Sequence, residues 1–120
     1  MPNATLRRPD SAVVLFESSA HIKSRPAALF ASLHRRLDPG PDAVSGFVAS
    51  KSGFRIVTEG GGWYRAEFQV IPDVKGCIIE HFVLDSTGSI STQSRSVQKV
   101  LEQAPSSFEK LIRLLRAELE

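Results

Sequence analysis

Cysteine is nearly absent from this chain of 120 residues, in which Cys77 is the only one. One cysteine cannot form a disulfide within the chain, and it cannot supply the thiolates of a multi-cysteine zinc site. Cys77 also falls in a predicted strand with no base beside it, which favours a core position over a catalytic nucleophile. Because the chain cannot form a disulfide of its own, we expect the protein to reside in the cytoplasm.

A long hydrophobic run is also lacking. No window approaches the ~20 continuous apolar residues that a membrane span needs, so we expect none. The opening residues 1–12, MPNATLRRPDSA, contain two arginines but no apolar stretch, which argues against a secretory signal. We interpret residues 1–12 as a flexible N-terminal tail and residues 13–120 as a single domain.

An excess of charge of one sign is lacking as well. Fifteen Lys and Arg residues face thirteen Asp and Glu residues, a formal net charge of +2. The pairs Arg7-Arg8 and Arg35-Arg36 are far apart in the sequence, whereas nucleic-acid sites gather positive charge on one face. We expect no nucleic-acid partner.

Motifs for cofactors and nucleophilic catalysis are missing too. Gly60 to Gly62 lies between two predicted strands and lacks the helix and lysine of a phosphate loop, and no serine has a GxSxG context. Glu17, His21 and His81 have residue types that bind metals, but their spacing does not demand a site. We expect no cofactor and no metal, and we interpret Glu17 and His21 as surface or rim residues.

The clearest feature that is present is a predicted meander of three strands between Phe54 and Leu84. Its turns are Gly60 to Gly62 and Pro72 to Gly76. In the middle strand Tyr64, Ala66, Phe68 and Val70 alternate with Arg65, Glu67 and Gln69. This alternation predicts one dry face and one face in contact with water.

The other elements are predicted around this meander. Residues 13–22 form a strand, Pro26 to Leu37 form a helix with Ser24 as its N-cap, and residues 43–50 form a weak strand or a loop. Residues 85–96 form a polar loop, and helical spacing continues from Ser96 to the end. Pro105 either kinks one long helix there or separates two helices, the second capped by Ser106 and Ser107.

The order strand, helix, meander, helix predicts an α+β fold, in which a curved antiparallel sheet of five to seven strands is wrapped around a long C-terminal helix. The segments IKSRPAALFASL, GGGWYRAEFQV, KGCIIEHFVLD and APSSFEKLIRLLRAELE carry a resemblance to the START-like or SRPBCC superfamily. This superfamily has the helix-grip fold and includes polyketide cyclases and relatives of the birch-pollen allergen. Its sheet normally has seven strands, so this shorter chain implies a smaller or more open pocket.

The superfamily places its ligand between the sheet and the C-terminal helix. Period-two and helical spacing predict which side chains would line that cavity. They are Tyr64, Phe68, Ile79, His81, Val83, Leu111 and Leu115. His81 is a candidate acid or base, with a structural core histidine as the alternative; if the strand phase is reversed, Glu80 enters the pocket instead.

Three functions are consistent with this resemblance, because the superfamily contains lipid carriers, cyclases, oxygenase subunits and co-chaperones. The first is binding of a small hydrophobic ligand, either lipid-like or polyaromatic. The second is an enzyme of the polyketide cyclase or dehydratase type, with His81 as acid or base. The third is a co-chaperone or protein-interaction module that uses the exposed sheet. The oligomeric state does not follow from the sequence.

Overall fold

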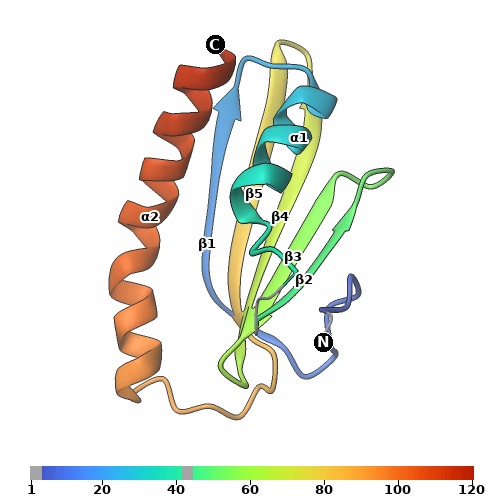
Figure 1. Ribbon diagram of the computed structural model, residues 1–120. Coiled ribbons are helices and arrows are strands. Elements are labelled where there is room, and N and C mark those ends of the chain that lie inside the picture. The colour runs from blue at the N-terminus through green and yellow to red at the C-terminus, as the bar shows by residue number, and fades with distance from the viewer. Residues whose placement is uncertain (1–3, 42–44) are drawn as a thin grey trace.

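The computed structural model describes residues 4–41 and 45–120, and its elements follow the predicted order (Figure 1). They are β1 (Val13–Ile22), α1 (Pro26–Leu37), β2 (Gly46–Ser50), β3 (Arg55–Gly60), β4 (Tyr64–Asp73), β5 (Gly76–Asp85) and α2 (Arg95–Leu119). The protein has two layers, because both helices cover the same face of one sheet.

Within the described residues, the sheet has five strands in the order β1-β5-β4-β3-β2, and every neighbouring pair is antiparallel. The predicted meander is β3, β4 and β5. Gly61 and Gly62 form its first turn with φ angles of 61° and 78°, which a side chain would disfavour. The expected weak strand is β2, which begins at Gly46; the expectation for residues 43 and 44 lies outside the described residues.

Helix α1 has its predicted bounds but a different cap. Arg25 is the N-cap residue and its side chain makes no capping hydrogen bond, so the expectation for Ser24 is wrong. Pro26 occupies the first helical turn, where its missing N–H has no intrahelical partner. The first turn is therefore stabilised by the fixed φ of proline in place of a polar cap.

Helix α2 is one continuous helix that contains Pro105, which decides between the two expectations for this segment. Ser94 caps it by accepting a hydrogen bond from the Val97 N–H, at 3.3 Å. No second helix begins at residue 106, so Ser106 and Ser107 are not caps. Among the described residues, no helix combines the length and apolar character needed to cross a bilayer.

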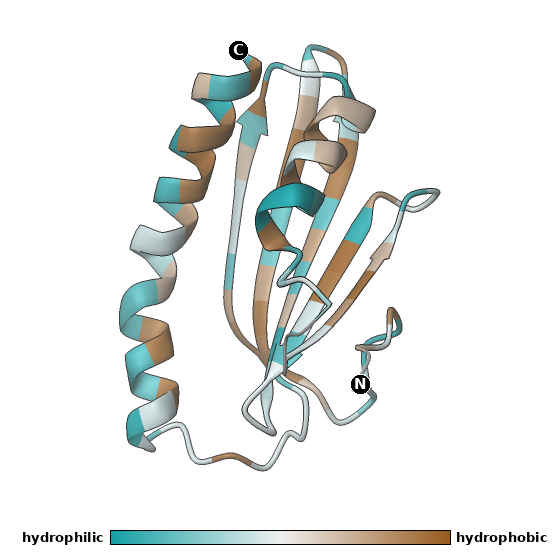
Figure 2. Ribbon diagram, in the orientation of Figure 1, coloured by the Kyte–Doolittle hydropathy of each residue, from teal (hydrophilic) through white to brown (hydrophobic). Residues whose placement is uncertain are grey.

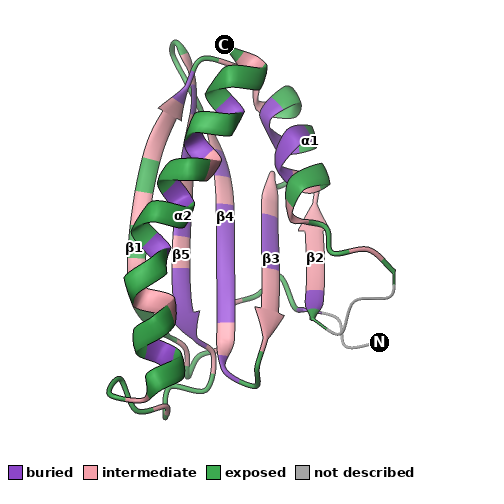
Figure 3. Ribbon diagram, turned by 60° about the vertical axis from the view of Figure 1, so that its left-hand side comes forward, coloured by how far each residue is buried: buried purple, intermediate pink, exposed green. Residues whose placement is uncertain are grey.

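The core lies between the sheet and the two helices. Hydrophobic positions recur along the strands and along α2 (Figure 2), and the buried positions of α2 lie on its side toward the sheet (Figure 3). Phe108, Ile112 and Leu115 of α2 pack there with Leu29 and Leu33 of α1. The predicted dry face of β4 is confirmed, because Ala66, Phe68 and Val70 belong to the same cluster.

The opposite face of β4 was predicted to contact water, and this is wrong for Arg65 and Glu67, whereas Gln69 is partly exposed. Arg65 and Glu67 are both 0% exposed and their side chains are 2.8 Å apart. Arg8, Arg55 and Glu59 complete an outer-face charge cluster around this pair. The alternation correctly assigned the two faces, but a charged residue can be buried when its partners neutralise it.

Residues 4–8 cover this cluster. The backbone carbonyls of Thr5 and Leu6 accept hydrogen bonds from Arg65, at 2.8 and 3.1 Å, and Arg8 pairs with Glu67 at 2.6 Å. Ala4 is only 5% exposed. These contacts hold part of the N-terminal segment against the sheet; whether residues 1–12 are flexible in solution stays a prediction.

Candidate functional site

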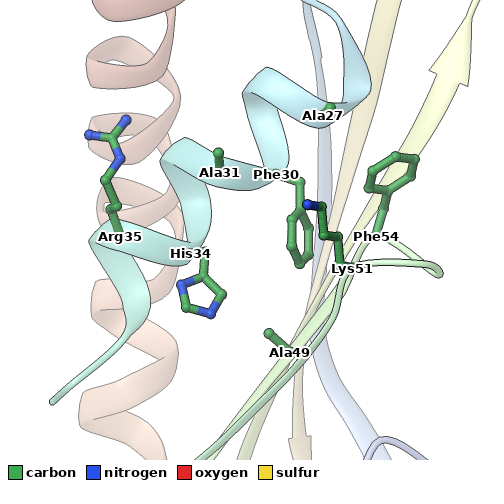
Figure 4. Close-up of a pocket in the computed structure, with 8 residues that line it drawn as sticks. All are labelled: Ala27, Phe30, Ala31, His34, Arg35, Ala49, Lys51 and Phe54. Atoms are coloured by element: carbon green, nitrogen blue, oxygen red, sulfur yellow. The ribbon is translucent and has the colours of Figure 1, made fainter.

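A recess of 510 Å³ opens on the inner side of the sheet, between α1 and the hairpin that joins β2 to β3 (Figure 4). Its lining consists of Ala27, Phe30, Ala31, His34, Arg35, Ala49, Lys51 and Phe54. Most of these side chains are apolar, and none is acidic. This recess was not predicted from the sequence.

The space exists because small side chains stand where two elements face each other. Ala27 and Ala31 are four residues apart and so share one face of α1, and Ala49 of β2 lies opposite them. Phe30 and Phe54 form an aromatic wall, with ring centroids 5.8 Å apart and planes at 57°. The three alanines are the signal in the sequence, but only the fold shows that they meet.

Phe54 has an unusual backbone. Its φ of 51° makes it the one residue other than glycine with a positive φ among those described. This conformation costs a residue with a side chain roughly 1–2 kcal/mol. The neighbouring Gly53 would adopt it freely, yet the turn places Phe54 there, and the ring thereby becomes part of the recess.

The turn is held in place by β4. The Gln69 side-chain amide donates to the Gly53 carbonyl at 2.7 Å, and the Val70 N–H donates to the Phe54 carbonyl at 2.9 Å. These bonds fix the backbone on both sides of the Phe54 Cα. The strained conformation is therefore imposed by the sheet and is present before any ligand binds.

Three nitrogen-bearing side chains border the recess. His34 packs edge-on against Phe47, with centroids 5.3 Å apart. Arg35 extends toward α2 and donates to a Glu118 carboxylate oxygen at 2.8 Å. Lys51, in the β2–β3 turn, points toward α1 (Figure 4). None of the three was predicted from the sequence as a site residue.

The sequence-predicted His81 lies on the inner face, as expected. It is 7% exposed and stacked between Phe68 and Phe108, with centroid distances of 4.3 and 5.4 Å. Phe16 approaches from β1 at 6.2 Å. Glu80 accordingly belongs to the other face of β5.

The tautomer of His81 follows from its one hydrogen bond. Its Nδ1 lies 3.3 Å from the Glu67 backbone carbonyl, which can only accept, so Nδ1 carries the hydrogen. Burial lowers the pKa of His81 to about 4, and the bond to the carbonyl offsets only part of this effect. The ring is therefore neutral at pH 7, and Nε2 is an acceptor.

A cavity of 220 Å³ adjoins His81 between the sheet and the first half of α2. Three of the predicted ligand-binding residues line it, namely Tyr64, His81 and Val83. The helix contributes Val100, Gln103, Ala104 and Ser107 to the lining. Burial raises the pKa of Tyr64, so its hydroxyl stays protonated.

The other predicted ligand-binding residues lie in the packed core. Phe68, Ile79 and Leu115 belong to the central cluster of buried residues, and Leu111 packs against it half-buried. None of these four residues lines the cavity beside His81. Their role in ligand binding stays a prediction.

Glu17 and His21 lie on the outer face of β1, across the sheet from His81. His21 instead has Asp73 beside it, with 3.5 Å between Nε2 and Oδ2. In the described parts of the chain, no three His, Cys, Asp or Glu residues are grouped as metal ligands would be.

No protein-family model matches this sequence, and no curated protein matches it. Among solved structures, the fold is similar to the solution NMR structure of an AHSA1-like protein from Rhizobium etli. The two share 16% sequence identity with a TM-score of 0.53, over 95% of this chain and 84% of that chain. Identity this low shows the fold alone. The predicted α+β helix-grip fold is thereby confirmed, with five strands and one long C-terminal helix in the described part of the chain.

Proposed function

We propose that this protein binds a small hydrophobic molecule on the inner side of its sheet. The observation that carries this proposal is the recess between α1 and the β2–β3 hairpin. Its 510 Å³ falls within the roughly 300–1,000 Å³ typical of small-molecule sites, and its walls are largely apolar. The Phe30 and Phe54 rings offer an aromatic surface to such a molecule, whether lipid-like or polyaromatic.

The cavity beside His81 is a second position for a ligand, and it is the one that the sequence favoured. At 220 Å³ it is smaller than typical sites. It suits a small ligand or a fragment of a larger one, which Nε2 of His81 would orient by accepting a hydrogen bond.

The same imidazole supports a second candidate function, an enzyme of the cyclase or dehydratase type. A neutral His81 with Nδ1–H held by a carbonyl has Nε2 free to accept a proton, as a base that the low pKa makes weak at pH 7. In that case a His81→Phe variant should lose roughly 100-fold or more in rate with any substrate found. No described contact favours the interaction-module alternative, and residues 4–8 cover part of the outer sheet face on which it would depend.

The test of ligand binding uses N-phenylnaphthylamine, a neutral probe that fluoresces in apolar surroundings. We expect saturable binding to the wild type. Ala31→Phe should weaken it by roughly tenfold, because the new ring occupies the recess. Ala28→Phe is the matched control, since Ala28 is exposed on the same helix and does not line the recess.

Two results would count against the proposal. Absence of saturable binding to the wild type contradicts ligand binding by this chain. Equal binding by both phenylalanine variants and the wild type would instead show that the ligand binds outside the recess. The cavity beside His81 would then be tested with His81→Phe.

A further inference from the structure

The charges around the recess are unequally distributed. Its lining includes Arg35 and Lys51 but no aspartate or glutamate. Arg35 shares the Glu118 carboxylate with Arg36, at 2.8 and 2.7 Å, and its side chain leads away toward α2 (Figure 4). Lys51 is therefore the cation of the lining whose charge is directed across the recess.

Lys51 has no ion pair or side-chain hydrogen bond with the described residues. Its side chain is exposed, and its ammonium group points toward α1 across the recess. The apolar stem of the side chain can lie along the wall while the charge stays near water. A ligand that enters here meets one positive charge beside an apolar surface.

The strained turn links this charge to the aromatic wall. Lys51 and Phe54 belong to the same four-residue connection between β2 and β3, and Gln69 anchors its backbone. The positive φ of Phe54 sets the direction of its ring. One rigid turn thus presents both an apolar surface and an ammonium group to the recess.

We propose that the recess selects small carboxylic acids that have an apolar body. The body lies against Phe30 and Phe54, and the carboxylate accepts hydrogen bonds from Lys51 Nζ. His34, which borders the same recess, offers a ring nitrogen as a second polar contact. A single lysine complements a single negative charge, whereas phosphate groups are usually held by arginine forks or several backbone N–H groups. This inference rests on the proposed function and adds the chemical class of the ligand.

The experiment compares naphthoate with naphthamide, which share one apolar body and differ in charge. Binding is followed by NMR titration of the isotope-labelled protein, so that the shifted amides locate the site. We expect naphthoate to bind the wild type roughly fivefold more tightly than naphthamide. The factor is modest because Lys51 is exposed and solvent screens its charge.

Three variants identify the source of that preference. Lys51→Met should remove it while naphthamide binds as before, and Lys51→Arg should keep most of it. Lys110→Met is the matched control: Lys110 is exposed on α2, does not line the recess and changes the net charge equally. Added salt should weaken naphthoate binding and leave naphthamide binding unchanged.

The outcomes separate this inference from the proposed function. If both probes shift the recess amides with equal affinity, the ligand class is wrong although the recess binds hydrophobic molecules. If Lys51→Met keeps the preference for naphthoate, the assignment of the carboxylate to Lys51 is wrong. If shifts map to residues around His81, the recess assignment is wrong. If neither probe binds, the proposed function and the inference both fail.

Discussion

At the scale of single residues, His81 shows how a polar side chain is accommodated in an apolar core. Two phenylalanine rings cover its faces, and one backbone carbonyl satisfies Nδ1. The depressed pKa means that the folded state excludes the proton that the unfolded chain accepts near pH 6.5. His81 therefore makes the stability of the fold depend on pH.

We expect the free energy of unfolding to fall as the pH is lowered from 7 toward 5. In this range the unfolded state binds a proton at His81 and the folded state does not. The free energy of unfolding lost through His81 reaches roughly 3 kcal/mol below pH 4, where both states are protonated. His81→Phe should lose this slope and be about as stable as the wild type at pH 7. Urea unfolding at several pH values measures both.

The carboxylates provide an internal check on that experiment. Burial raises the pKa of Glu67, but hydrogen bonds from Arg8 and Arg65 and the charge of Arg55 outweigh it and hold the pKa below its ordinary value. The stability this gives is present above that ordinary value and is lost at lower pH. Identical slopes for the wild type and His81→Phe between pH 7 and 5 would contradict the assignment to His81.

At the scale of elements, α2 is held to the sheet by one stripe of its surface. Two adjacent leucines illustrate this, since Leu115 is 0% exposed and Leu114 is 43% exposed. Leu115 lies in the central core cluster with Phe108 and Ile112. Comparing substitutions at these two positions therefore measures how much the buried stripe of α2 contributes to the stability of the fold.

We expect Leu115→Ala to lower the free energy of unfolding by about 2–5 kcal/mol, because it removes buried apolar surface and leaves a cavity. Leu114→Ala is the matched control and should change it by about 0.5 kcal/mol or less. Chemical denaturation followed by circular dichroism compares the two. Equal costs would mean that α2 does not pack on the sheet through this face.

At the scale of the whole molecule, the N-terminal segment closes the outer side of the sheet. Arg65 donates to two carbonyls of this segment, and Glu67 pairs with Arg8 from it. Without residues 1–8 the buried guanidinium of Arg65 would lose two acceptors and Glu67 one positive partner. A buried polar group that loses its hydrogen-bond partner destabilises the folded state by more than the original hydrogen bond stabilised it.

Deleting residues 1–8 should therefore lower the free energy of unfolding by about 2–4 kcal/mol, and Arg8→Met alone by about 1–2 kcal/mol. Arg7→Met serves as the control, because the Arg7 side chain is 84% exposed and its effect should be about 0.5 kcal/mol or less. Unchanged stability after the deletion would show that these contacts contribute nothing. Proteolysis of the intact chain within residues 4–8 would separately support a flexible tail.

Features that depend on local pattern can be predicted from the amino-acid sequence. Alternation along β4 assigned its two faces, and Pro26 with the following apolar spacing fixed the bounds of α1. The turn predicted at the glycines is confirmed, because Gly61 and Gly62 have the positive φ angles that glycine adopts most easily. Period and propensity act over a few residues, so one sequence is enough to show them.

The contacts that those faces make depend on the folded chain. Alternation could not reveal that residues 4–8 bury Arg65 and Glu67, because these partners are about 60 positions away in the chain. Nor could it place Ala31 opposite Ala49, or give Phe54 a conformation that its neighbour Gly53 would adopt more easily. Burial, charge neutralisation and the shape of a recess are set by contacts between distant segments, and these contacts exist only in the folded chain.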